Sequence, residues 1–202
     1  MISLALIGQN ITIVYKSIDL TDLDSRKIKQ LLSDKAVLTE FPNMIVAFDP
    51  VGPLVVQVGD NRIRVTLQGE SQSLTNLWDV AYRNHLEVKH GDLIAYGFNF
   101  DLRVSTPNSD SNEILTKMFL SNQQDISDRL QGKLLSITPR IKYIKDAVIY
   151  DLIIEYVDNN KFIAHMNFHY EFEDINLSPD ILQKGFVEGY EYLTATLPQL
   201  IS

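Results

Sequence analysis

The side chains best suited to chemistry lie near the end of the chain, on a stretch that alternates apolar and polar residues. His165, His169 and Glu171 fall on one face of this stretch, because successive side chains of a strand point to opposite faces. Imidazole and carboxylate groups are common metal ligands and acid–base catalysts. Histidines four residues apart on a strand are separated by about 13 Å, however, so they cannot bind one ion together without a sharp bulge.

Neighbouring stretches extend this face. The apolar positions of 147–157 and 161–172 align when a three-residue loop at 158–160 puts Val157 opposite Lys161. A shift by one residue would turn the apolar side chains of one strand outward. The resulting register pairs Asp151 with Asn167, Ile153 with His165, and Ile149 with His169. A tight turn at 145–146 places Arg140 opposite Asp151.

The sequence therefore predicts one polar sheet surface that carries six candidate binding residues. They are Arg140, Asp151, His165, Asn167, His169 and Glu171, with Lys142 and Glu155 beside them. An ordinary solvated sheet face, in which each charge pair contributes about 0.2–1 kcal/mol, would explain this pattern. A partner-binding face would also explain it, since Ile149 and Ile153 add apolar area between polar groups. The third interpretation is a metal or acid–base site built on His169 and Glu171, for which no third ligand can be assigned.

Composition and missing motifs exclude several kinds of catalysis. The chain has no cysteine, so thiol catalysis, thiolate metal sites and disulfides are impossible. It also lacks phosphate-binding glycine loops, a nucleophile elbow and the zinc-binding His-Glu-x-x-His motif. We therefore predict no catalytic residue, no metal and no cofactor, and no motif points to a particular family.

The elements that must carry the polar surface are strands that cluster instead of alternating regularly with helices. The clearest hairpin joins 53–58 to 62–67, and a long strand over 94–104 has Asn99 and Asp101 on the face opposite its aromatic residues. Short polar side chains cap helix starts. We expect such starts at Asp22 or Asp24, at Ser71 or Ser73, at Asp110 and at Ser178. This order predicts an α+β fold with a mainly antiparallel, curved sheet, several helices packed against it and a long C-terminal helix.

The length of 202 residues fits a single domain. The best internal boundary is the polar turn near Pro107, which would divide residues 1–106 from 107–202 as two sub-lobes. An asparagine between core residues recurs at Asn99 and Asn167, so a degenerate two-lobe duplication is a further hypothesis. In the last helix, Gly185 and Gly189 are expected to let the helix approach the sheet closely.

Charge is distributed unevenly along the chain. The formal net charge is −8, yet residues 1–145 are neutral because their 16 basic and 16 acidic side chains cancel. Residues 146–202 contain ten acidic side chains and only two basic ones, Lys161 and Lys184. This acidic C-terminal region favours a basic partner and disfavours nucleic acid. A local basic patch is still feasible at Arg62, Arg64, Arg140 and Lys142.

These observations lead to a functional prediction. No apolar run reaches the length of a transmembrane helix and no signal-peptide pattern opens the chain, so we expect a soluble, cytoplasmic protein. The favoured function is a non-catalytic protein-interaction module that binds another, basic protein or a second copy of itself, through the acidic region or the polar surface. The alternatives are a small-molecule or metal-dependent enzyme that uses His165, His169 and Glu171, and a carrier of apolar ligands between the sheet and the last helix.

Overall fold

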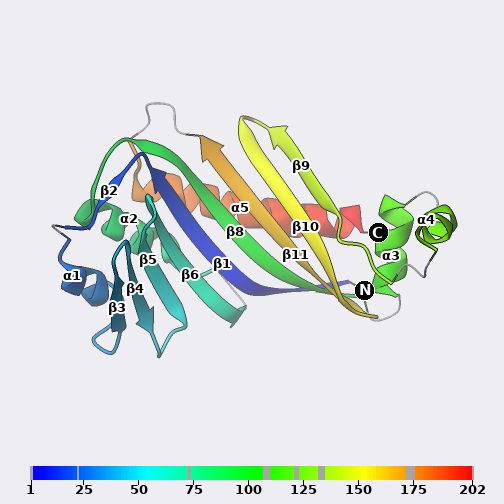
Figure 1. The fold of residues 1–202 in the computed structure, drawn as a ribbon, viewed down its shortest axis with the longest axis horizontal. Coiled ribbons are helices and arrows are strands. Elements are labelled where there is room, and N and C mark those ends of the chain that lie inside the picture. The colour runs from blue at the N-terminus through cyan, green and yellow to red at the C-terminus, as the bar shows by residue number, and fades with distance from the viewer. Residues whose placement is uncertain are drawn as a thin grey trace.

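The structure, a computed structural model, describes residues 2–21, 23–71, 74–106, 110–120, 123–131, 135–171 and 176–201. Figure 1 shows a large twisted sheet with the long last helix behind it. The strands of this sheet are β1 (Ser3–Tyr15), β3 (Val37–Phe41), β4 (Met44–Asp49), β5 (Leu54–Gly59), β6 (Arg62–Ser71), β8 (Leu93–Ser105), β9 (Arg140–Lys145), β10 (Val148–Asp158) and β11 (Lys161–Glu171). A small second sheet pairs β2 (Ile18–Asp19) with β7 (Lys89–His90). The helices are α1 (Ser25–Gln30), α2 (Leu77–Glu87), α3 (Ser111–Phe119), α4 (Gln123–Leu130) and α5 (Pro179–Leu200).

The large sheet is antiparallel and contains, in the described part of the chain, nine strands in the order β3-β4-β5-β6-β1-β8-β11-β10-β9. Its two ends are built from local hairpins, whereas its centre joins strands distant in sequence, since β8 pairs with both β1 and β11. This architecture confirms the predicted α+β class. The proposed boundary at Pro107 lies outside the described residues, so the two sub-lobes and the duplication stay predictions.

One face of the sheet is apolar and is covered by α2 and α5. Phe186 of α5 lies against Phe98 and Phe100 of β8, with ring centroids 5.6 and 4.9 Å apart. Trp78 of α2 contacts the same Phe186 ring at 6.0 Å. Phe98, Phe100 and Phe186 are completely buried, and burial of such side chains supplies most of the stabilisation of a fold of this kind.

The two glycines of α5 face the sheet, which confirms the expected close approach. A Cβ atom added to Gly185 would lie 2.6 Å from Cε2 of Phe98, closer than atoms in contact can be. A Cβ atom added to Gly189 would lie 3.5 Å from the rings of Phe100 and Phe168, an ordinary contact distance. Only the first position therefore requires a residue without a Cβ atom.

Most of the predicted helix starts are confirmed. The side chains of Asp24, Asp110 and Ser178 each accept a hydrogen bond from a backbone N–H in the first turn of the following helix. The prediction for α2 is wrong: its cap is Asn76, because β6 extends through Ser71 and the helix starts only at Leu77. The alternatives Asp22 and Ser73 lie outside the described residues.

The three predicted pairs between β10 and β11 are confirmed. Asp151 faces Asn167, Ile153 faces His165, and Ile149 faces His169. The loop itself is different, since Asp158 pairs with Lys161 and a bulge between Tyr156 and Asp158 takes up Val157. A bulge inserts one residue into a strand, so it produces the same register as the longer loop.

The predicted register of β9 is wrong by two residues. Lys142, not Arg140, faces Asp151, and Arg140 faces Ile153. The turn consists of Asp146 and Ala147, which have φ values of 50° and 63°. Positive φ values at both central residues are typical of a type I′ turn, which suits two-residue hairpin loops. A shift of two residues keeps every side chain on its predicted face.

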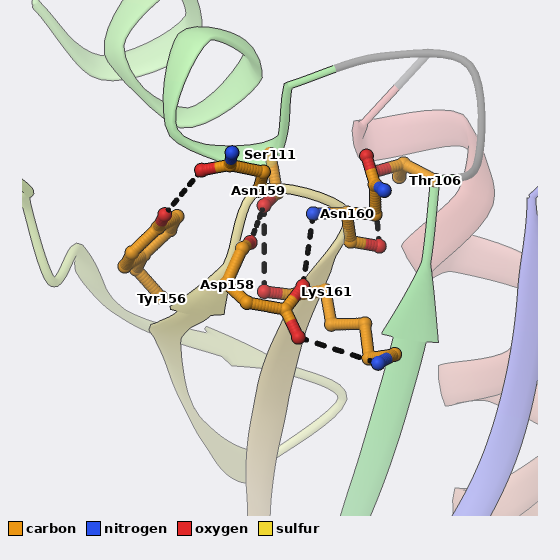
Figure 2. Close-up of polar contacts among 7 residues, drawn as sticks. All are labelled: Thr106, Ser111, Tyr156, Asp158, Asn159, Asn160 and Lys161. Carbon is orange, nitrogen blue, oxygen red and sulfur yellow. Dashed lines mark hydrogen bonds and ion pairs between the residues drawn. The ribbon is translucent and has the colours of Figure 1, made fainter.

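The tip of the β10–β11 hairpin is tied to α3 and to the end of β8 (Figure 2). The backbone N–H of Ser111 donates to the carbonyl oxygen of Asn159 over 2.7 Å, and the Ser111 hydroxyl donates to that of Asp158. The backbone N–H of Thr106 donates to the carbonyl oxygen of Asn160 over 2.8 Å. These bonds fix the hairpin, and with it the strands that carry the predicted polar surface.

Candidate functional site

The candidate site is the sheet face opposite α5, which we call the polar face; it is turned toward the viewer in Figure 1. A row of directly paired residues crosses all nine strands on this face. The row consists of Val37, Phe48, Val55, Thr66, Asn10, Asn99, Asn167, Asp151 and Lys142. Its centre is polar, and its β3–β5 end is apolar.

Three asparagines form a ladder across the centre of the polar face. Asn99 Nδ2 donates to Asn10 Oδ1 over 2.8 Å, and Asn167 Nδ2 donates to Asn99 Oδ1 over 2.6 Å. Each amide has two N–H donors and an oxygen with two lone pairs, so the ladder orients the amides and leaves hydrogen-bonding capacity for a ligand. Sequence reasoning identifies only Asn167 as a site residue, although the recurrence of Asn99 between aromatic residues is a signal for the ladder.

His165 lies between two carboxylates of neighbouring strands. Its Nδ1 atom is 2.7 Å from Asp101 Oδ1, and its Nε2 atom is 3.4 Å from Glu155 Oε2. The hydrogen bond with Asp101 and the negative charges of both carboxylates raise the pKa of His165, and partial burial opposes them. Two carboxylates that approach both ring nitrogens favour the cationic form of the imidazole, and in that form neither nitrogen has a lone pair for a metal. Among the described residues, no three His, Asp or Glu side chains are arranged to hold a metal ion.

Arg140 and Asp151 form a bidentate ion pair. Arg140 Nε lies 2.8 Å from Asp151 Oδ1, and Nη2 lies 2.5 Å from Oδ2. The hydrogen bonds from Arg140 lower the pKa of the Asp151 carboxyl, although its burial acts in the opposite direction. The pair is diagonal across β9 and β10, so the length of the arginine side chain compensates for the shifted register. It neutralises part of the acidic C-terminal region, as the sequence suggests.

A hollow of about 380 Å³ opens beside these groups. Four of the six predicted residues line it, namely Asp151, His165, Asn167 and His169, together with Ile149, Ile153 and Lys142. Arg140 reaches its edge through Asp151, whereas Glu171 is exposed at the end of β11 opposite Ala95 and lies apart. The hollow depends on a glycine, because a Cβ atom on Gly8 would lie 2.5 Å from Asp101 Oδ2 and displace the carboxylate that binds His165.

A second hollow of about 640 Å³ adjoins the first on the side of β6 and β1. Asp101 and His165 line both hollows. The second hollow is otherwise lined mainly by neutral hydrogen-bonding side chains and by one cation, Arg64. The two hollows are therefore neighbours on the polar face and share the Asp101–His165 pair.

The apolar side of the sheet is largely filled. Phe98, Phe100 and Phe168 are buried against α5, and their rings fill the centre of this side. A hollow of about 180 Å³ remains between the end of α5 and strands β9 to β11. Its lining includes Ile141, Tyr143, Leu152, Met166, Tyr192 and Leu197. It is smaller than the ligand pockets of about 300–1,000 Å³ that are usual for small molecules.

In the part of the chain that the structure describes, no helix combines the length and apolar character needed to cross a bilayer. No protein-family model matches the sequence, and no curated protein matches it. The geometry of the polar face is therefore the basis for assigning a function.

Proposed function

We propose that the protein is a non-catalytic interaction module that binds another protein on its polar face. The observation that carries this proposal is the nine-strand row, in which oriented amides at the centre continue into exposed apolar side chains. Val37 and Phe48 at the β3–β4 end are 57% and 41% exposed, and Ile144 on β9, at the opposite edge of the same face, is 73% exposed. Protein interfaces combine apolar contact area with polar groups that fix orientation.

The polar centre is preorganised for binding. The asparagine ladder and the His165–Asp101 pair hold their side chains through hydrogen bonds made within the sheet. A partner that binds such side chains does not have to order them, which reduces the entropic cost of association. Carboxylates of Asp101 and Glu155 approach both nitrogens of His165, which favours a binding role over acid–base catalysis at this residue.

The prediction of a basic partner rests on a different surface, the acidic side chains of α5. Asp180, Glu188 and Glu191 of α5 are exposed, and α5 lies on the opposite side of the sheet from the polar face. We therefore propose the polar face as the main docking surface and treat the α5 carboxylates as the alternative. We further expect the complex to form in the cytoplasm, because a chain without cysteine has no disulfide that reducing conditions could break.

Site-specific photo-cross-linking in cells tests the proposal. Lys142 and Gln57 are replaced in separate variants by benzoylphenylalanine, because each side chain lies on the polar face and lines one of its two hollows. The matched control replaces Gln183, an exposed residue of α5. We expect both polar-face positions to cross-link to the same protein and the α5 position to give no such product.

A second part of the experiment tests whether the cross-linked complex depends on the asparagine ladder. Asn99→Leu should abolish cross-linking from Lys142 and Gln57, because it removes the central amide of the ladder. Cross-linking from Gln183 alone would assign the partner to α5 and contradict the proposal. Cross-linking to a second copy of the chain would identify the partner as the protein itself, and no cross-link from the polar face would refute the proposal.

A further inference from the structure

Arg64 is a half-buried cation for which the described residues supply no anionic partner. Its side chain lies in the larger hollow of the polar face, and its Nε donates a hydrogen bond to the hydroxyl of Thr12 over 3.3 Å. Within the described residues, no carboxylate lies within ion-pair distance of it. Arg103 and Arg140, on the same face, are instead paired with Glu70 and Asp151.

The electrostatic environment does not compensate for this missing partner. Burial lowers the pKa of the Arg64 guanidinium, and the neighbouring charge of Arg62 lowers it further. Asp101 is the acidic residue among those that line the hollow, and it already binds His165, whose own pKa is raised. The Asp101 carboxylate is thus directed at His165, and Arg64 is a fixed cation in the described lining of the hollow that can attract an anion.

The remaining lining of the hollow suits an oxyanion. Gln57 faces Arg64 on β5, and Thr12 faces it on β1. Asn10, Thr66 and Gln68 add further amide and hydroxyl donors. Guanidinium N–H groups form a fork that matches two oxygens of a carboxylate or phosphate, and neutral N–H and O–H groups can hold the others.

We infer that this hollow is an oxyanion-binding site, in which the free N–H groups of Arg64 bind a carboxylate or phosphate group and Arg62 adds attraction from the rim. The bound anion would replace water around a partly desolvated guanidinium, which strengthens the ion pair. This inference does not depend on the proposed protein partner, because a free small anion can occupy the site.

Titration calorimetry and thermal unfolding with inorganic phosphate and with acetate test the inference and distinguish the two chemistries. Sodium chloride at matched ionic strength serves as the salt control. We expect at least one of the two oxyanions to bind saturably at millimolar concentration and to raise the melting temperature more than chloride does. Arg64→Gln should weaken this binding tenfold or more, whereas the control Arg103→Gln should leave it within about twofold.

Two further variants test oxyanion binding at Arg64 if Arg64→Gln fails to fold. Arg64→Lys keeps the charge but loses the planar fork, so it should weaken oxyanion binding severalfold while the protein stays folded. Thr12→Val removes the hydrogen bond that orients Arg64 and should weaken binding in the same direction. Equal effects of chloride and both oxyanions, or unchanged affinity in the folded Arg64 variants, would overturn the inference.

Discussion

The packing of α5 on the sheet can be tested with one substitution made at two positions. Gly185 and Gly189 are one helical turn apart and both face the sheet, yet the space around them differs. A Cβ atom at Gly185 would lie 2.6 Å from Cε2 and 3.1 Å from Cζ of Phe98. At Gly189 the nearest side-chain atoms are 3.5 Å away.

The Phe98 ring cannot easily move away from the new methyl group. Phe98 is fully buried, and its ring centroid lies 5.7 Å from that of Tyr96, 5.4 Å from that of Tyr170 and 5.6 Å from that of Phe186. Forcing an extra methyl group into such a core costs about 1–3 kcal/mol. Replacing glycine by alanine inside a helix contributes about 0.5–1 kcal/mol in the opposite direction.

The two variants should therefore differ in sign. Gly185→Ala is expected to reduce the free energy of unfolding by about 0.5–2 kcal/mol, and Gly189→Ala to increase it by about 0.5–1 kcal/mol. The helix-propensity gain is common to both variants, so the difference between them measures overpacking alone. For a chain of this size, each kcal/mol corresponds to about 2–4 °C in melting temperature.

Urea unfolding followed by circular dichroism gives both free energies. The dependence on urea should be the same in both variants, which shows that the denatured state is unchanged. If Gly185→Ala proves as stable as Gly189→Ala, then α5 does not approach β8 as closely as the structure shows, and the account of these two glycines is refuted.

Three further predictions concern the polar groups. Stability should fall as pH drops from about 6.5 to 4, because burial lowers the pKa of His85 to about 4 in the folded protein and the unfolded chain binds a proton first. After allowance for solvent screening of a half-exposed ring, the free energy of unfolding should fall by about 1–2 kcal/mol over this range. In His85→Gln, the free energy of unfolding should depend less steeply on pH than in the wild type, and an equal dependence would contradict this prediction. Asn99→Leu should destabilise the protein by about 1–2 kcal/mol in urea unfolding, since it leaves two half-buried ladder amides with one partner fewer; an unchanged midpoint would show that water replaces the ladder at no cost. A double-mutant cycle on Arg140→Ala and Asp151→Ala should give a small favourable coupling energy that decreases with added salt. A coupling of zero would mean that the observed ion pair contributes nothing to stability.

Much of the fold follows from local pattern. The alternation of apolar and polar residues identifies β8, β10 and β11, and it fixes which residues of each strand point to the polar face. Short polar caps such as Asp24 and Asp110 locate helix starts because they satisfy the unpaired N–H groups of the first turn. The cap of α2 is missed because β6 continues further than its apolar alternation suggests, and that extension depends on pairing with β1.

The sequence pattern predicts the register of paired strands only up to a shift of two residues. A shift of one residue reverses the faces of a strand and is excluded by the pattern, but a shift of two keeps the faces and costs nothing in apolar burial. This explains why Arg140 is placed on the correct face and opposite the wrong residue. The turn residues Asp146 and Ala147 decide that register through their positive φ values. These values could not be predicted from the residue types alone.

The sequence by itself determines the elements, the polar character of one sheet face and the membership of Asp151, His165, Asn167 and His169 in that face, because these depend on period and local chemistry. Only the tertiary structure decides which distant strands become neighbours. The asparagine ladder joins β1, β8 and β11, and Asp101 meets His165 across another such pairing. The surroundings of Arg64 likewise depend on tertiary structure, since Gln57 of β5 and Thr12 of β1 are the residues that face it. Pairing of distant strands is set by the burial of the whole sheet against α5, a global free energy that no local segment contains.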